Sequence, residues 1–282
     1  EIPLERVRFG MSKTLLSFIF LLAGAVSAQT FAPGSEASTL TGPNISKTFV
    51  LPGDEVLPQI ANGELGGGQI FFTLFQAVNI SGGPASFTVS FFDGDGDPMT
   101  LPILQDGVTI NANMIGDAIA PGGVRFARTV PTAAPVQIGY AVVSSVPEGA
   151  VAVVARFSNQ VPGERLFQAS IPVETRLHQS FFMPFINSDG FVGSIAVVSL
   201  VEQAVDFSVR SASGTELCST TENFAAGQHK AFLLAALLPC SAETNAVLAA
   251  EGESIGLSAV GFTAGDLGLG SFVTAPVYGP LP

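Results

Sequence analysis

Three aspartates are the first residues of this 282-residue chain whose type and spacing could do chemistry. Asp93, Asp95 and Asp97 alternate as the first three ligands of a calcium-binding loop do. Calcium takes about six to eight oxygen ligands, and an EF-hand loop has a glutamate at its twelfth position. This chain has Leu104 there, and Pro98 follows the third aspartate. We therefore interpret the segment as a solvated hairpin tip, with a weak calcium contact as the alternative.

The two cysteines, Cys218 and Cys240, are the only ones in the chain. The N-terminal region predicts an exported protein, and an even pair of cysteines in such a protein is most simply a disulfide. The spacing of the two cysteines is not that of a CxxC redox or zinc motif. Closing this loop is expected to stabilise the fold by roughly 3 kcal/mol. We predict a structural disulfide.

The two histidines, His178 and His229, do not have the spacing of a metal motif. A Ser-His-Asp triad assembles in space, so spacing alone does not decide it, but no G-x-S-x-G elbow is present. Glu148 and Glu253 match each other across an internal repeat, which favours a shared structural place over one active site. We expect no catalytic residue, no enzymatic activity and no cofactor other than the calcium alternative.

Composition and charge exclude several classes of protein. The chain is 47% hydrophobic with 23 Phe, too apolar for a disordered protein. It has 11 Lys+Arg against 23 Asp+Glu and a net charge of −12, which argues against a nucleic-acid partner. Trp is absent, so an aromatic platform for sugars would have to use Tyr140 or Tyr278.

The N-terminal region has the three-part layout of a secretory signal peptide over residues 11–28. We expect cleavage between Ala28 and Gln29, followed by a flexible leader over 29–47. Residues 1–10 precede the start methionine, and we interpret them as an upstream extension outside the native fold. The apolar run is too short to span a bilayer comfortably. We therefore expect a secreted protein, extracellular or periplasmic, with no membrane span in the mature chain.

The chain repeats itself at an offset of 105 residues. This shift places Phe157 on Phe262, and it places Ala120-Pro121-Gly122 on Ala225-Ala226-Gly227. The front parts match at a larger offset, which predicts roughly twenty extra residues in the loops of the first copy. We place the first unit at 48–174 and the second at 175–282.

Each unit alternates apolar and polar residues with a period of two, as Phe87, Val89 and Phe91 do. Glycine- and proline-containing turns separate the short runs. This pattern predicts antiparallel β-sheets packed as sandwiches. Lys230 to Leu238 is the one helix-like stretch, and we interpret it as a buried strand or a brief crossover helix.

The motifs LPQxANG, FFDGDGDP, APGG and FxxxxxGxxxFQASIPV follow one another in the first unit. Their order resembles a tandem repeat of uncharacterised secreted bacterial proteins whose units are Ig-like β-sandwiches. The second unit departs from the repeat, because Ser213-Gly214-Thr215-Glu216 stands in place of FFDxxGxP. The resemblance implies the fold and export, and it carries no catalytic or binding residues.

The sequence thus predicts an all-β protein of two tandem antiparallel Ig-like β-sandwich domains after a cleaved signal peptide. The leading hypothesis is a secreted, non-enzymatic structural or interaction module at the cell surface, with an unknown protein or polysaccharide partner. The alternative is a carbohydrate-binding or adhesive module, which exposure of Tyr140 or Tyr278 beside acidic loops would favour. A secreted hydrolase ranks third. The sequence leaves the oligomeric state open.

Overall fold

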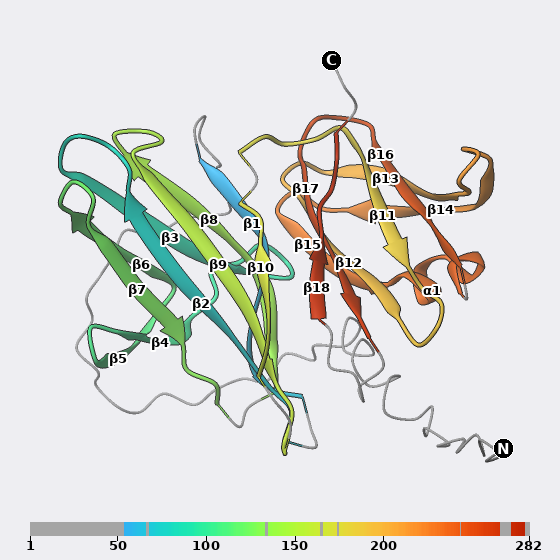
Figure 1. Ribbon diagram of the computed structural model, residues 1–282. Helices are drawn as coiled ribbons and strands as arrows, with labels where there is room; N and C mark the ends of the chain where they lie inside the picture. The colour runs from blue at the N-terminus through green and yellow to red at the C-terminus, as the bar shows by residue number, and fades with distance from the viewer. Residues whose placement is uncertain are drawn as a thin grey trace, which may run out of the picture. The chain divides into compact units, whose positions relative to one another are not determined.

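The protein folds into antiparallel β-sheets, as its alternating sequence predicts (Figure 1). The structure is a computed structural model. It describes residues 54–65, 68–132, 135–163, 166–173, 175–242, 244–265 and 272–279. All of them belong to one compact unit, Leu40–Pro282. The predicted upstream extension, signal peptide, leader and cleavage between Ala28 and Gln29 lie outside the described residues.

The first half of the described chain forms two sheets. Its strands are β1 (Glu55–Glu64), β2 (Ile70–Asn79), β3 (Ala85–Asp93), β4 (Leu101–Gln105), β5 (Val108–Ala112), β6 (Met114–Ile119), β7 (Val124–Thr129), β8 (Gln137–Val146), β9 (Val151–Gln160) and β10 (Leu166–Ile171). Sheet A has the order β1-β8-β3-β6. Sheet B has the order β5-β4-β7-β2-β9-β10, and the end of β1 joins it by pairing with β2.

The second half also forms two sheets. Its elements are β11 (Ser180–Ile186), β12 (Val192–Ser199), β13 (Gln203–Arg210), β14 (Glu216–Phe224), β15 (Gln228–Leu233), α1 (Leu234–Leu237), η2 (Pro239–Ser241), β16 (Asn245–Gly252), β17 (Leu257–Ala264) and β18 (Phe272–Ala275). Sheet C has the order β15-β12-β17-β18, and sheet D has the order β11-β16-β13-β14. The helix-like stretch Lys230 to Leu238 begins as the half-buried end of β15 and continues as the one-turn helix α1, so the predicted crossover helix is present and the predicted strand is half-buried.

The two halves have the same strand order once the β4–β5 hairpin is set aside. Sheet D repeats the order of sheet A, and sheet C repeats the order of sheet B without that hairpin. Gly122 and Gly227, which the 105-residue offset aligns, both adopt positive φ, at 69° and 75°. This conformation favours glycine. Each of the two glycines lies just before its strand, β7 or β15, and these strands are equivalent. The β4–β5 hairpin accounts for most of the extra residues of the first copy.

Alternating burial builds a core between the two sheets of each half. In β3, Phe87, Val89 and Phe91 are buried, while the residues between them are partly exposed. Sheet B contributes the facing residues from β2 and β9 to the same cluster. The core of the second half is a separate cluster that includes Phe181 and Phe207. Large apolar side chains on one face of most strands are thus removed from water, which favours folding.

The two halves meet at a contact that we call the junction. Ala196, Val260 and Phe262 lie on the face of sheet C that points away from its own core, and they belong to the core cluster of the first half. The ring of Phe262 lies 5.7 Å from that of Phe157. The sequence offset aligns these two phenylalanines, yet Phe157 points into its own core and Phe262 points out of its own. They are partners at the junction and do not occupy equivalent places.

Candidate functional site

Asp93, Asp95 and Asp97, predicted as a hairpin tip with a weak calcium contact as the alternative, form the tight turn between β3 and β4. The Asp93 carboxylate accepts hydrogen bonds from the backbone N–H groups of Asp95 and Asp97, each at 3.0 Å. The backbone N–H of Asp93 also donates to the carbonyl of Asp97 at 2.9 Å. Asp93 therefore caps its own turn, as aspartate commonly does. Among the described residues, no group of three or more His, Cys, Asp or Glu is arranged to hold a metal ion, and calcium binding here stays a prediction.

The same turn touches the second half at the junction. The backbone N–H of His229 donates to the carbonyl of Gly94 at 2.9 Å. Gly96 has a φ of 81°, and a Cβ at this position would lie 2.6 Å from the carbonyl oxygen of Gly227. Only glycine suits both the backbone conformation and the close approach. The turn that the sequence presents as a solvated tip is therefore part of an internal contact.

His229 is buried beside this turn. Its side chain is 6% exposed, and its Nε2 lies 2.9 Å from the Oε1 of Gln59 on β1. Burial lowers the pKa of His229 to about 4, although a backbone hydrogen bond with Pro58 acts in the opposite direction. The ring is thus held neutral at the junction, where it is a structural group.

The other residues considered for catalysis lie apart from a common site. His178 pairs with Leu257 through the backbone, and its ring meets that of Phe181 edge-on at 6.5 Å. Glu148 and Glu253 are exposed in turns. Neither histidine is among the residues that line the hollow on the outer face of sheet D.

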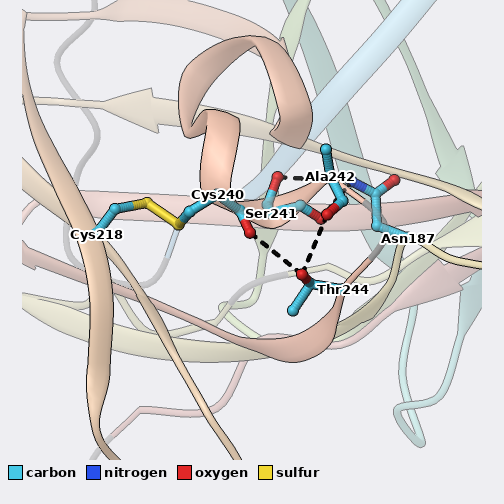
Figure 2. Close-up of a disulfide and its surroundings, with 6 residues drawn as sticks. All are labelled: Asn187, Cys218, Cys240, Ser241, Ala242 and Thr244. Carbon is cyan, nitrogen blue, oxygen red and sulfur yellow. Dashed lines mark hydrogen bonds between the residues drawn. A yellow bond between two sulfur atoms is a disulfide. The ribbon is translucent and has the colours of Figure 1, made fainter.

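The predicted disulfide joins Cys218 and Cys240 (Figure 2). Cys218 lies on the edge strand β14 and Cys240 lies in η2, with their Cα atoms 6.2 Å apart. Around the bond, the Thr244 hydroxyl donates to the Cys240 carbonyl at 3.2 Å. The Asn187 amide donates to the Ser241 carbonyl at 2.9 Å. The bond thus ties the crossover after sheet C to the edge of sheet D.

A hollow of about 490 Å³ lies on the outer face of sheet D, and we call it the trough. Its floor is a cross-strand row of side chains on adjacent strands, namely Phe182, Ala249, Ser208 and Ser219. The last three are small, so the face is hollowed between its larger neighbours. Paired residues on adjacent strands present their side chains on the same face, which makes this row continuous.

Charged residues border the floor on both sides. On one side Glu251 and Asp206 lie directly opposite each other, and the Thr221 hydroxyl donates to Asp206. On the other side Arg210 lies opposite Glu216 in the pairing of β13 with β14. Two carboxylates opposite each other on neighbouring strands repel, so sheet stability alone does not explain this row. The trough therefore offers hydroxyls, carboxylates and one guanidinium to a ligand.

Two aromatic residues extend the floor at one end. Tyr278 pairs with Phe182 through two backbone hydrogen bonds of 2.8 Å each. Phe182 is 38% exposed and Tyr278 is 55% exposed. Tyr140, the other predicted platform residue, is buried and stacks on Phe92 with ring centres 5.2 Å apart. Of the two tyrosines, Tyr278 is the exposed one.

Sequence reasoning missed the trough itself. Its signal was the polar alternation of Asp206, Ser208 and Arg210 along β13, which resembles any solvent-facing strand. What makes these residues a site is their register with β16 and with the chain around Tyr278, and a single strand does not reveal that register.

Comparison with known proteins adds no assignment, because no protein family, no curated protein and no solved structure matches this chain. None of the helices in the described residues has the length and apolar character needed to cross a membrane.

Proposed function

We propose that this protein is a secreted, non-enzymatic interaction module that binds a neutral polysaccharide in the trough. We infer further that its halves are two tandem Ig-like β-sandwich domains following a cleaved signal peptide. The Cys218–Cys240 disulfide supports export, because such bonds persist in oxidising compartments. The shared strand order of the halves supports a tandem repeat. The single observation that carries the binding proposal is the row in which two exposed aromatic residues adjoin small residues, bordered by hydroxyls and carboxylates.

The chemistry of the trough suits a sugar chain. Sugar hydroxyls both donate and accept hydrogen bonds, so they can pair with the carboxylates of Asp206 and Glu251 and with Ser and Thr hydroxyls. The apolar face of a sugar ring can pack on Phe182 and Tyr278, which present large, flat apolar surfaces. From Ser219 to Tyr278 the row crosses four strand spacings, about 19 Å. This length fits several linked sugars better than one.

The charge of the trough narrows the ligand class. Three carboxylates and one guanidinium line it, those of Asp206, Glu216, Glu251 and Arg210. A polymer rich in uronate or sulfate groups would meet net repulsion there. Neutral polymers, whose hydroxyls can donate to the carboxylates, are therefore the expected ligands.

Binding of the purified protein to an array of neutral and anionic glycans and cell-wall polymers tests the proposal. We expect neutral polymers to bind and anionic ones to fail. Phe182→Ala and Tyr278→Ala should each weaken a positive interaction by about tenfold, because each removes one aromatic contact. Calorimetry on the strongest ligand measures the loss.

Ile80→Ala is the control, because Ile80 is an exposed apolar residue in the turn between β2 and β3, away from the trough. It should leave the affinity unchanged. A blank array, or equal losses in Ile80→Ala and Phe182→Ala, would contradict the proposal. Repeating the array with calcium and with a chelator tests the Asp93–Asp97 turn separately, and Asp95→Asn should abolish any calcium effect that arises there.

A further inference from the structure

The outer face of sheet B, which points away from the core of the first half, carries apolar side chains and arginines. Phe126 and Val154 lie on either side of Gln76 in one cross-strand row, and they are 54% and 41% exposed. The next row places Arg128 and Arg156 on either side of β2. The strands β2, β7 and β9 contain no Asp or Glu, although the chain has 23 such residues. An exposed apolar face of this kind marks an interaction surface.

The repeat indicates what this face contacts, because its counterpart in the second half is buried. Sheet C is the counterpart of sheet B in strand order. Phe126 and Ala231 occupy matching places, each four residues after the positive-φ glycine that opens its strand. The cross-strand row of Ala231 is completed by Ala196 and Val260, which are buried at the junction. The exposed row of sheet B thus corresponds to a row that is covered in sheet C.

The surface that covers sheet C has its own counterpart, and that counterpart is the trough. At the junction Val56 and Val142 of sheet A cluster with Val198 of sheet C. Sheet D is the counterpart of sheet A, and Phe182 takes the place of Val56, each two residues before a proline. Ala249, the row neighbour of Phe182, takes the place of Val142. The two exposed faces are therefore equivalent to the two faces that meet at the junction.

The two exposed faces also have opposite charge. The side chains that line the trough carry a net charge of −2, from three carboxylates and one guanidinium. Arg128 and Arg156 give the part of the outer face formed by β7, β2 and β9 a charge of +2. Two sheet B faces placed together would oppose arginine to arginine, whereas a sheet B face on a trough pairs arginine with carboxylate. In that arrangement Phe182 and Tyr278 of the trough would provide apolar surface for Phe126 and Val154 of the sheet B face.

We propose that the outer face of sheet B of one copy docks into the trough of a second copy, repeating between molecules the contact that joins the two halves within one. This contact is heterologous, so each pair leaves one sheet B face and one trough unoccupied, and copies can add to form an open chain. The inference stands without the polysaccharide proposal. Because both use the trough, a docked copy and a bound polysaccharide exclude each other.

Two charge-reversed variants of the full protein test the proposal. Arg128→Glu with Arg156→Glu reverses the sheet B face, and Asp206→Arg with Glu251→Arg reverses the trough. Sedimentation velocity and light scattering over a concentration series report the assembly state. The wild type should grow in mass with concentration and shrink in high salt, which screens the charges. Each double variant alone should be monomeric. An equal mixture of the two should recover assembly, because the intact sheet B face of one variant meets the intact trough of the other and the two reversed faces also have opposite charge.

Glu148→Arg with Glu253→Arg is the control for charge, since it makes the same change at exposed turns outside both faces. It should assemble like the wild type. A trough variant that still dimerises alone would show a different interface and overturn the proposal. A wild type that stays monomeric up to about 1 mM would do the same. Circular dichroism and thermal melting identify a variant that fails to fold, and Asp206→Asn with Glu251→Gln then replaces it and should weaken assembly in the same direction.

The glycan array keeps this inference distinct from the proposed function. The sheet B variant should lose assembly and keep polysaccharide binding. The trough variant should lose both. If assembly is seen and no glycan binds, the polysaccharide proposal fails alone.

Discussion

The turn between β3 and β4 and the turn between β13 and β14 have the same backbone geometry and different surroundings. In the first, the N–H of Asp93 donates to Asp97, and in the second, the N–H of Ser211 donates to Thr215, each at 2.9 Å. Gly96 and Gly214 occupy the same position in the two turns, and both have a φ of 81°.

The contrast lies in what each turn touches. A side chain at Gly96 would meet the carbonyl of Gly227 across the junction, whereas one at Gly214 would have open space around it. The aspartate-rich signature is present where the turn reaches the junction and is replaced by Ser213-Gly214-Thr215-Glu216 where it does not. This difference indicates that the motif, which resembles a cation loop, supports the contact between the two halves.

The two halves also differ in what stabilises them. The core of the first half includes Phe262 of the second half, while the second half has its own core and a disulfide. Damage at the junction should therefore weaken the first half most, and damage to the disulfide should weaken the second half most.

The largest expected effect is that of Phe262→Ala. This side chain is 7% exposed and contacts Phe157, so its removal leaves a cavity at the junction. Truncating a buried phenylalanine costs about 4 kcal/mol. Urea unfolding followed by circular dichroism should show this loss. Phe126→Ala, on an exposed face, should change stability by less than about 0.5 kcal/mol. Equal effects of the two substitutions would contradict the assignment of Phe262 to the core.

The next effect is that of replacing both cysteines with serine. Loss of the disulfide should destabilise the second half by about 3 kcal/mol, since the loop between Cys218 and Cys240 gains freedom in the unfolded chain. Native-state hydrogen exchange distinguishes the halves. Amides of β14 and β16 should exchange faster, and amides of β3 and β8 should change little. Uniform acceleration across both halves would instead mean that they unfold as one unit.

Acid should weaken the junction through His229. Its pKa is about 4 in the folded protein and near 6.5 when unfolded, so the unfolded state binds more protons between these values. Stability is therefore complete above about pH 6.5 and is lost as pH falls toward 4, by up to about 3 kcal/mol. His229→Gln does not titrate in this range. The difference in unfolding free energy between wild type and His229→Gln should shrink as pH falls from 7 to 4. A difference that does not change with pH would show that His229 does not titrate on unfolding.

Much of the fold could be predicted from the sequence, because it depends on local pattern. The alternation of Phe87, Val89 and Phe91 indicates a strand buried on one face, and two cysteines in a chain with a predicted signal peptide indicate a disulfide. The offset of 105 residues correctly aligned the glycines at 122 and 227, whose backbone conformation is the same.

The remainder depended on register between strands, which local pattern does not contain. Phe157 and Phe262 match in sequence, but they point to opposite faces of their sheets. A shift of one residue along a strand exchanges its two faces, and sequence similarity does not detect it. The trough was missed for the same reason. Asp206 and Glu251 are distant in sequence and become neighbours only through the pairing of β13 with β16.

The smallest expected effect returns to the two turns and isolates the junction contact. Gly214→Ala places a side chain in the left-handed region with open space around it, which costs about 1 kcal/mol. Gly96→Ala has the same φ and adds a clash with the Gly227 carbonyl, so it should cost about 2 kcal/mol. Because the two glycines share a φ of 81°, the difference between their unfolding free energies measures the contact alone. Equal costs would mean that the β3–β4 turn moves away from the second half without penalty, and the comparison between the turns would then lose its structural basis.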